Sequence, residues 1–334
     1  MTTNPTPTGR QDPATSRQAD PRARKAQAGS HEERPERTAA SDDIADFVRL
    51  VASDHDATVG PRTVVRELTQ QGRRQPGPDH AQLYTCAGVV VKLHPRGTDV
   101  VLLARRLQSM ARPGVSRFWI QPLRALPMPG PRGRLATTWP HVGVLTPTDQ
   151  PPWTQLGTLL ARLHQTPPSR PGAPPSGAPA RLARATAHLR QHTGENLDWL
   201  AELGDGLIRQ LRQPSRTTLI HGDLHLGQLG RPPEGSWKLL DPDDTGIGDP
   251  AWDLARPAGL WAAGLLDDAS WNALLTAYRD AGGAAVPPTG DPWANLDLPA
   301  RAATLIATVQ ALRSPEHPDM TCVLVQACRR MLGH

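Results

Sequence analysis

The first 43 residues differ from the rest of the chain in their pattern of hydrophobic positions. Residues 1–43 contain no Leu, Ile, Val, Phe, Trp or Tyr. A segment with nothing apolar to bury cannot offset the entropy lost on ordering, so we expect these residues to form a disordered tail. From Ile44 apolar residues recur at helical spacing, which predicts a helix, until a Gly-, Pro- and Arg-rich stretch at 72–79 interrupts the pattern.

The next segments have the pattern of strands. The β-branched run AGVVVKLHP at 87–95 predicts a buried strand. Two more strands are predicted at 117–126 and 132–138, around the turn PMPGPRG, and a helix at about 98–110 precedes them. Together with residues 87–93, these strands predict a small antiparallel sheet.

Beyond residue 141 the hydrophobic spacing is mostly helical. In the segment 151–168, four leucines at positions i, i+3, i+4 and i+7 form one stripe, which predicts a helix, and His164 at its end is interpreted as a packing or capping residue. A Pro- and Gly-rich loop follows as far as Ala180. Further helices are predicted, in chain order, at 181–192, 195–212, 250–263, 268–281, 292–313 and 318–332.

These elements predict an α+β fold with two lobes. Residues 44–140 would form the smaller lobe, around the antiparallel sheet. Residues 141–334 would form a larger and mainly helical lobe, and the segment 136–145 would be the hinge between the two. A chain of 334 residues is long enough to give both lobes a hydrophobic core.

Two short apolar runs in the second lobe are each followed by acidic residues. TTLI precedes HGDLHLGQ at 221–228, and WKLL precedes Asp241. Two short strands would present Asp223 and Asp241 side by side, at the ends of rigid elements where reactive residues are usually placed. Clustered carboxylates repel one another, so such a site needs a cation or a shared proton. Oxygen ligands from Asp241, Gln228 and substrate phosphates would suit Mg²⁺.

Two other interpretations of the same residues remain open. The pattern His221, Asp223, His225 could bind zinc, with Asp241 as a further ligand. A lone His-x-Asp in a loop is more often a turn device than a reactive site. The second group of aspartates, Asp241 with its neighbours at 243 and 244, favours chemistry over a turn.

At this point the residues resemble the aminoglycoside phosphotransferase and choline kinase superfamily, relatives of the eukaryotic-type protein kinases. That family carries H-x-D-x-x-x-x-N, then a metal-binding aspartate, then G-D-P-x-x-D-L-A. The corresponding residues here are His221, Asp223, Gln228, Asp241, Gly248-Asp249-Pro250 and Asp253-Leu254-Ala255. Most of the family has Asn where this chain has Gln228, and HGDLHLGQ looks like the maltokinase branch. Gln offers the same amide oxygen on a side chain one methylene longer.

The resemblance implies a role for each of these residues. Asp223 would be the catalytic base, and Gln228 and Asp241 would hold Mg²⁺ on the phosphates of ATP. Asp243 is a candidate for a second metal contact, as is Asp244, although either could instead cap the turn. His221 and Asp253 would brace the catalytic loop, and His225 would either touch the γ-phosphate or pack beneath the loop.

Lys92 is the candidate nucleotide-binding residue of the smaller lobe. Lysine occurs only at 25, 92 and 238, so a lysine inside an apolar strand is unusual in this chain. A buried lysine is costly unless it is paired. By resemblance Lys92 would contact the α- and β-phosphates of ATP; alternatively it lies at a strand edge and reaches water.

Two features of the nucleotide lobe depart from the family pattern. No Gly-rich phosphate loop is recognisable before the strand, although Gly72 and Gly77 lie in the right region. The predicted helix at 98–110 has no Glu to pair with Lys92, and Gln108 lies about where that Glu is expected. A catalytically impaired, nucleotide-binding pseudokinase is therefore one alternative.

Composition excludes several other classes of function. The net charge is +5, but residues 1–40 contribute +2 of it and no Lys- and Arg-rich patch is interleaved with aromatics, so we expect no nucleic-acid partner. The three cysteines form no paired framework. No secretory segment and no apolar run long enough to span a bilayer is visible, so we expect a cytoplasmic protein without a membrane partner.

The function expected from these observations is phosphoryl transfer from ATP, with GTP as the alternative donor, to a hydroxyl group, with Mg²⁺. Residues 141–213 and 251–334 together contain thirteen acidic and thirteen basic residues, which argues against a pocket for polycationic aminoglycosides. We therefore expect a metabolite, sugar or neutral antibiotic as acceptor. The alternative from another class is a kinase-like enzyme that phosphorylates Ser or Thr of a peptide or protein in a natural-product pathway.

Overall fold

The structure, a computed structural model, describes six stretches of the chain. They are residues 42–68, 80–167, 172–192, 197–212, 216–313 and 317–332, and all of them belong to the unit Ala39–His334. The predicted tail, apart from Asp42 and Asp43, lies outside the described residues, as do Gly72 and Gly77. Asp42 and Asp43 begin the first helix, so that helix starts two residues before the predicted boundary.

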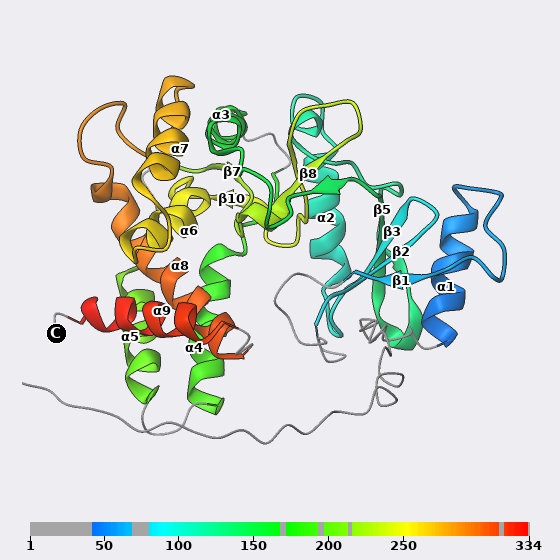
Figure 1. The fold of residues 1–334 in the computed structure, drawn as a ribbon, viewed down its shortest axis with the longest axis horizontal. Coiled ribbons are helices and arrows are strands. Elements are labelled where there is room, and N and C mark those ends of the chain that lie inside the picture. Colours follow the sequence, from blue (N-terminus) through cyan, green and yellow to red (C-terminus); the bar gives the residue numbers. More distant parts are fainter. Residues whose placement is uncertain are drawn as a thin grey trace, which may run out of the picture. The chain divides into compact units, whose positions relative to one another are not determined.

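The smaller part of the fold is built on an antiparallel sheet of five strands in the order β1-β2-β3-β5-β4 (Figure 1). The strands are β1 Arg66–Glu67, β2 Gln82–Cys86, β3 Val89–Leu93, β4 Met128–Pro129 and β5 Leu135–Pro140. Ala87 and Gly88, with φ of 46° and 78°, form the two-residue turn between β2 and β3. Positive φ at both positions is the geometry that matches the twist of a tight hairpin.

The predicted strands around the Pro-rich turn are only partly correct. Residues 132–138 correspond to β5, but the strand predicted at 117–126 is wrong. Ser116–Phe118 forms a short 3-10 helix instead, and β4 is limited to Met128–Pro129. Its first apolar residues, Phe118, Trp119 and Ile120, lie in the interior, whereas Leu123 and Leu126 are exposed, so the segment does not have the alternating burial of a strand.

Two helices cover the sheet in different ways. Helix α1, Asp42–Ser53, buries Val48 and Val51 in a cluster with Val91 and Leu93 of β3. Successive side chains of a strand point to opposite faces, so Lys92 lies on the face away from α1. That face is toward helix α2, Val100–Met110, which lies between the sheet and the rest of the fold (Figure 1).

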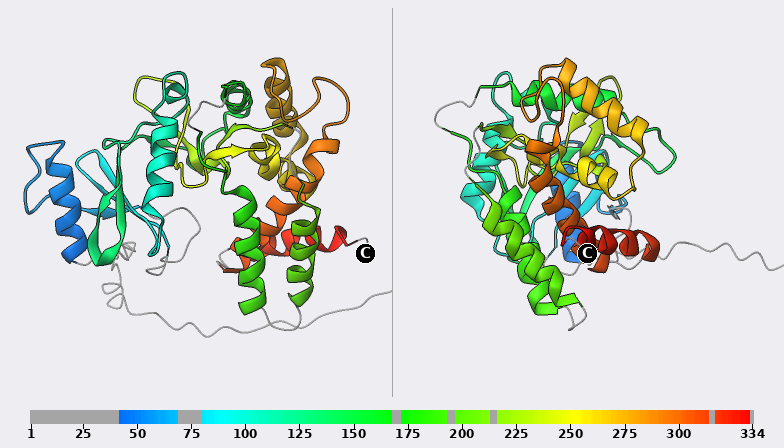
Figure 2. Two further views of the ribbon diagram at one scale, coloured as in Figure 1. Left: turned by 180° about the vertical axis from the view of Figure 1, so that it is seen from behind. Right: turned by 90° about the vertical axis from the view of Figure 1, so that its left-hand side faces the viewer.

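The larger part of the fold is mainly helical, and its helices confirm the predicted ones to within a few residues at most ends. They are α3 Trp153–His164, α4 Ala178–His192, α5 Asp198–Gln210, α6 Ala251–Ala262, α7 Asp268–Asp280, α8 Trp293–Arg313 and α9 Pro318–Arg330. One apolar cluster joins α2, α3, α6 and α7, and a second joins α4, α5, α8 and α9. Figure 2 shows α4 and α5 side by side, with α8 and α9 against them.

Short strands connect the sheet to the helices. β7, Thr218–Ile220, pairs with β10, Gly246–Gly248, and β8, Leu229–Arg231, pairs with both β6, Gly143–Val144, and β9, Lys238–Leu239. The hinge predicted at 136–145 is therefore shorter than expected. Its first five residues belong to β5, and Gly143–Val144 form β6, which pairs with β8. The predicted α+β, bilobal fold is confirmed, and β7 to β10 lie where its two parts meet.

Candidate active site

A buried carboxylate on α6 holds the loop that begins at His221. Asp253 is fully buried, and its two oxygens accept the backbone N–H groups of His221 and Gly222, each at 2.8 Å. Burial alone raises the pKa of Asp253, but the hydrogen bond and charge of His164, the charge of His221 and the Gly222 N–H hold that pKa below its ordinary value. Asp253 therefore fixes the main chain just before Asp223.

His164 is a second buried support of the same loop, which the sequence had assigned only to packing or capping. Its Nε2 lies 3.0 Å from Asp253, and its Nδ1 lies 2.8 Å from the hydroxyl of Tyr278. That hydroxyl accepts the N–H of Ala285 at 2.9 Å. No motif in the sequence signals this chain of contacts, because it depends on the packing of α3 against α7.

His221 has a structural position at the centre of the site. Its ring stacks on Trp119, with centroids 5.2 Å apart, and is completely buried. Nε2 donates to the carbonyl oxygen of Leu240 at 2.8 Å, and Nδ1 accepts the N–H of Asp223 at 3.3 Å. These two bonds tie the loop to the residue before Asp241.

The zinc interpretation does not fit this geometry. Both nitrogens of His221 are engaged by protein groups, and Nδ1 of His225 accepts the N–H of Gly227 at 3.1 Å. Across the described ranges, no three His, Cys, Asp or Glu side chains are arranged to hold a metal ion. His225 caps the short 3-10 helix Leu226–Gln228 and so shapes the loop that follows Asp223.

Asp223 lies beside an arginine that the sequence did not single out. Its Oδ2 is 2.6 Å from Nη2 of Arg181, at the start of α4, and its side chain is 18% exposed. Arg181 also contacts Asp244, which is buried. Burial raises the pKa of Asp223, and Arg181 opposes this only in part, so the pKa stays above its ordinary value. Asp244, a candidate metal contact from the sequence, thus pairs with an arginine.

Lys92 reaches the other group of carboxylates. Its Nζ lies 2.6 Å from Asp241 Oδ1 and 2.8 Å from Asp243 Oδ2, and the side chain is only 6% exposed. His94 Nδ1 lies 3.4 Å from the same oxygen of Asp243. Burial lowers the pKa of Lys92, but the two carboxylates outweigh burial and raise it. Burial raises the pKa of Asp243, while Lys92 and His94 bring it well below its ordinary value.

The residues predicted to hold Mg²⁺ fit that ion in kind and number. Asp243 Oδ1 is buried and finds no hydrogen-bond partner among the described residues, so this oxygen is available to a cation. Gln228 is buried, and its backbone carbonyl oxygen accepts the N–H of Leu240 at 2.8 Å, which places the residue beside the segment that leads into Asp241. Mg²⁺ usually takes only one or two protein carboxylates and completes its shell with water and substrate phosphates.

Helix α2 presents an arginine where the sequence suggested Gln108. Gln108 is exposed, so its expected position near Lys92 is wrong. Arg106, two residues earlier, is half-buried, and burial lowers its pKa while the charges of Asp244 and Asp243 act in the opposite direction. Residues two apart on a helix point to different faces. Placing the site-facing position of α2 two residues too late therefore selects the exposed Gln108 instead of Arg106.

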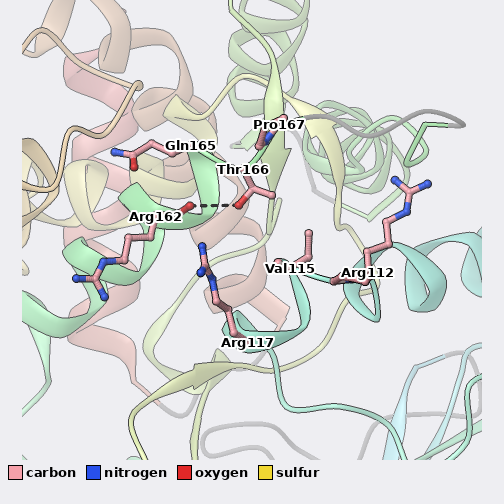
Figure 3. A pocket seen from close by; sticks show the side chains of 9 residues that line it. Arg112, Val115, Arg117, Arg162, Gln165, Thr166 and Pro167 are labelled. Carbon is pink, nitrogen blue, oxygen red and sulfur yellow. Dashed lines mark hydrogen bonds between the residues drawn. The ribbon is translucent and has the colours of Figure 1, made fainter.

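Two hollows of very different size lie near these elements. A cavity of about 30 Å³ beside Asp223 is lined by polar and apolar side chains, among them Arg181, Arg256 and Trp252. A hollow of about 600 Å³ lies between the segment after α2 and the end of α3, where Figure 3 shows Arg112, Arg117 and Arg162 around it. None of the predicted site residues lines the larger hollow, so its size alone does not make it the reaction centre.

None of the described helices combines the length and the apolar composition that crossing a bilayer requires. A sequence search of the curated proteins found no match.

Solved structures of kinases share this fold. Choline kinase LicA from Streptococcus pneumoniae superimposes with a TM-score of 0.54 at 13% identity, covering 85% of this chain and 97% of that one. A choline/ethanolamine kinase family protein from Mesorhizobium loti gives 0.53 at 15% identity, covering 86% and 93%. Aminoglycoside 2′-phosphotransferase-IIIa, in its GDP complex, gives 0.51 at 13% identity, covering 85% and 98%.

The family model described as "Phosphotransferase enzyme family" matches residues 88–293, which include β3 with Lys92, the loop from His221 and the segment through Asp253. The match covers more than half of the 334 residues. This chain therefore belongs to the phosphotransferase enzyme family.

Proposed function

We propose that the protein transfers the γ-phosphoryl group of a nucleoside triphosphate to a hydroxyl group of a small molecule. The observation that carries the proposal is the contact of Lys92, on the sheet, with Asp241 and Asp243, which follow β9 in the helical part. A lysine and two carboxylates from opposite sides of one site are the groups that position a phosphate chain and its metal ion.

The nucleotide would lie against the sheet, in the lobe of residues 44–140. Lys92 would leave part of its contact with the carboxylates and bind phosphate oxygens, and Arg106 of α2 supplies a second positive charge on the same side. Asp241, Asp243 and the amide oxygen of Gln228 would hold Mg²⁺, which neutralises charge on the phosphates when bound. ATP is the expected donor, with GTP as the alternative.

Asp223 would act on the acceptor from the lobe of residues 141–334. The acceptor oxygen attacks the γ-phosphorus, and an O–P bond forms while the bond to the β-phosphate oxygen breaks and its electron pair stays on the nucleoside diphosphate. The hydroxyl proton passes to the carboxylate of Asp223. His221 and Asp253 would hold that carboxylate in place through the main chain, and His225 would shape the loop or touch the γ-phosphate.

Small hydroxyl compounds are favoured as acceptors over peptides. The cavity beside Asp223 is about 30 Å³, and its lining, which includes Trp252 and Ile306, comes from buried or half-buried positions. So small a recess would admit one end of a compact molecule more easily than an extended chain. Kinases of choline and of aminoglycosides are among the proteins with this fold, and both act on small molecules as their names state.

Label transfer from γ-labelled ATP tests the proposal. The protein is incubated with Mg²⁺ and with separate pools of hydroxyl metabolites, sugars, neutral antibiotics and Ser/Thr peptides, and a matched sample contains a chelator. Label in a small molecule that disappears with the chelator supports the proposal. Label in peptides alone would assign the peptide-kinase alternative, and nucleotide binding without transfer to any pool would assign the non-catalytic one.

A further inference from the structure

The carboxylate of Asp223 is in contact with an arginine that lines the same small cavity. Arg181 is 24% exposed, and its Nη2 contacts both Asp223, at 2.6 Å, and Asp244. Its Nε is buried and has no hydrogen-bond partner among the described residues. A guanidinium group presents five donors in a planar fork that suits carboxylate and phosphate oxygens, so Arg181 has donor capacity beyond its present contacts.

A second arginine faces the same carboxylate. Arg256 of α6 is half-buried, lines the cavity beside Asp223, and lowers the pKa of Asp223 through its charge. Its Nη2 donates to Gln310 at 2.7 Å, which orients the guanidinium. Apart from Asp223, Arg181 and Arg256, the cavity is lined by uncharged residues: Ala178, Gly222, Leu224, Trp252, Ala255, Ala303 and Ile306. The lining itself therefore carries two positive groups and one negative group, while Asp244, which does not line the cavity, also contacts Arg181.

This charge balance selects against one class of acceptor. A polycation entering the cavity would meet two guanidinium groups where water is largely excluded, and like charges repel strongly there. A neutral alcohol carries no charge that could replace Asp223 as the partner of Arg181. Because the cavity measures about 30 Å³, with room for little more than a water molecule, an acceptor has to displace Arg181 from Asp223 to reach it.

We propose that the acceptor carries a carboxylate or phosphate group near its reacting hydroxyl, and that Arg181 and Arg256 bind this group. The anion replaces Asp223 as a partner of Arg181, so that acceptor binding frees the carboxylate that takes the hydroxyl proton. This inference rests on the proposed function, because it assumes that Asp223 is the base.

Asp244 makes the exchange of partners feasible. Its Oδ2 contacts the same Nη2 of Arg181 that Asp223 contacts, so the guanidinium keeps one carboxylate partner when Asp223 leaves it. The approach of the two segments depends on Gly177, where an added Cβ would overlap the carboxylate of Asp244. The N–H of Gly177 also donates to the carbonyl oxygen of Asp244 at 2.9 Å. Asp244 is therefore a positioning residue for Arg181.

Matched acceptors test the inference. One set consists of glycerol, glycerate, glycerol 3-phosphate and 3-aminopropane-1,2-diol; the other consists of glucose, glucuronate, glucose 6-phosphate and glucosamine. Formation of nucleoside diphosphate is measured with ATP and Mg²⁺. We expect kcat/KM for the anionic members to exceed that for their neutral counterparts by at least about tenfold, the effect of a charge-assisted hydrogen bond, with the amines lowest.

Two variants locate the effect. Arg181→Gln should remove the preference for anions, chiefly by raising KM for the anionic members, and Arg181→Lys should restore part of it. Arg162→Gln, in the larger arginine-lined hollow, should leave the preference unchanged. A neutral or cationic member that equals or exceeds its anionic counterpart would overturn the inference while leaving the phosphotransferase proposal intact, since turnover would have been observed.

Calorimetry decides the case in which no member of either set is turned over. Glycerate and glycerol 3-phosphate are titrated into protein already loaded with Mg²⁺ and a non-hydrolysable ATP analogue. Binding that Arg181→Gln weakens by about tenfold or more supports the inference. If the protein binds the ATP analogue but neither anion, the inference is overturned and the proposed function stands. If the analogue does not bind, both the proposed function and the inference are overturned.

Discussion

The site contains two groups of half-buried carboxylates that differ in which effect sets their pKa, the neighbouring positive charge or burial. Around Lys92, two carboxylates share one lysine, and the pKa of Asp243 is held well below its ordinary value although burial opposes this. Around Asp223, burial prevails over Arg181 and the pKa is raised. The first group stabilises permanent negative charge, as a metal site requires. The second holds a carboxylate whose affinity for a proton is increased, as a base requires.

The largest expected effect separates the two groups by function. Asp223→Asn should lower kcat by about 10²- to 10⁴-fold, the usual contribution of a general base, and should leave nucleotide affinity nearly unchanged. Asp241→Ala should weaken Mg²⁺-dependent nucleotide binding by about 10- to 100-fold, because charged oxygen contacts are lost. Steady-state kinetics and equilibrium nucleotide titration measure both. An Asp223→Asn variant with wild-type turnover would show that the base has been misassigned.

The support shared by the two groups gives the next largest effect. Asp253→Ala removes the acceptor of the His221 and Gly222 N–H groups and of His164, all of them buried. Breaking such a buried network should lower the free energy of unfolding by about 3–5 kcal/mol. Chemical denaturation measures it. Wild-type stability in this variant would mean that the loop is held by other contacts, such as the stacking of His221 on Trp119.

Opposite changes in stability are expected when each group loses a carboxylate. Asp243→Asn removes the negative charge that faces Lys92 and should cost about 1.5–3 kcal/mol at neutral pH, the range for hydrogen bonds to charged groups. Asp223→Asn removes a charge that burial disfavours, so the variant should be as stable as the wild type or more stable. Thermal unfolding of the two variants beside the wild type makes the comparison.

The pH dependence has a different sign in the two groups. The pKa of Asp243 is depressed in the fold, so its stabilising effect is present above the ordinary value of 3.8 and is lost as the pH falls toward the lower folded value. The pKa of Asp223 is raised, so stability is lost as the pH rises from the ordinary value of 3.8 to the higher folded value. The deficit of Asp243→Asn should therefore stay nearly constant between about pH 7 and about pH 5 and should shrink as the pH falls below about 4. A deficit that does not shrink below about pH 4 would contradict the Lys92 contact.

The smallest expected effect concerns α2. Gln108→Ala should change both the free energy of unfolding and kcat/KM very little, within about 0.5 kcal/mol, because Gln108 is exposed. Arg106→Ala is the matched variant on the buried side and should weaken nucleotide binding. Denaturation and nucleotide titration of the two variants decide which residue of α2 faces the site. A clear loss of activity in Gln108→Ala would instead support the sequence-based expectation that Gln108 lies near Lys92.

Local pattern predicted the helices well and the connections less well. Helices such as α7, Asp268–Asp280, repeat apolar residues over several turns, and that period is independent of the partner they pack against. The segment 117–126 has an apolar start and no period that separates strand from buried loop, so the predicted strand there was wrong. The 3-10 turn and the buried Trp119 depend on contacts with His221 and Leu239.

The sequence by itself determined the fold class and the order of its helices, and it singled out His221, Asp223, Asp241 and Asp253, because these depend on local spacing and on a motif read in order. Only the tertiary structure decided which cation meets which carboxylate. Lys92 and Asp241 are 149 positions apart, and Arg181 comes from a helix with no motif of its own. A pairing of this kind has no period along the chain, since it arises when separate elements are buried together and their charges must be compensated.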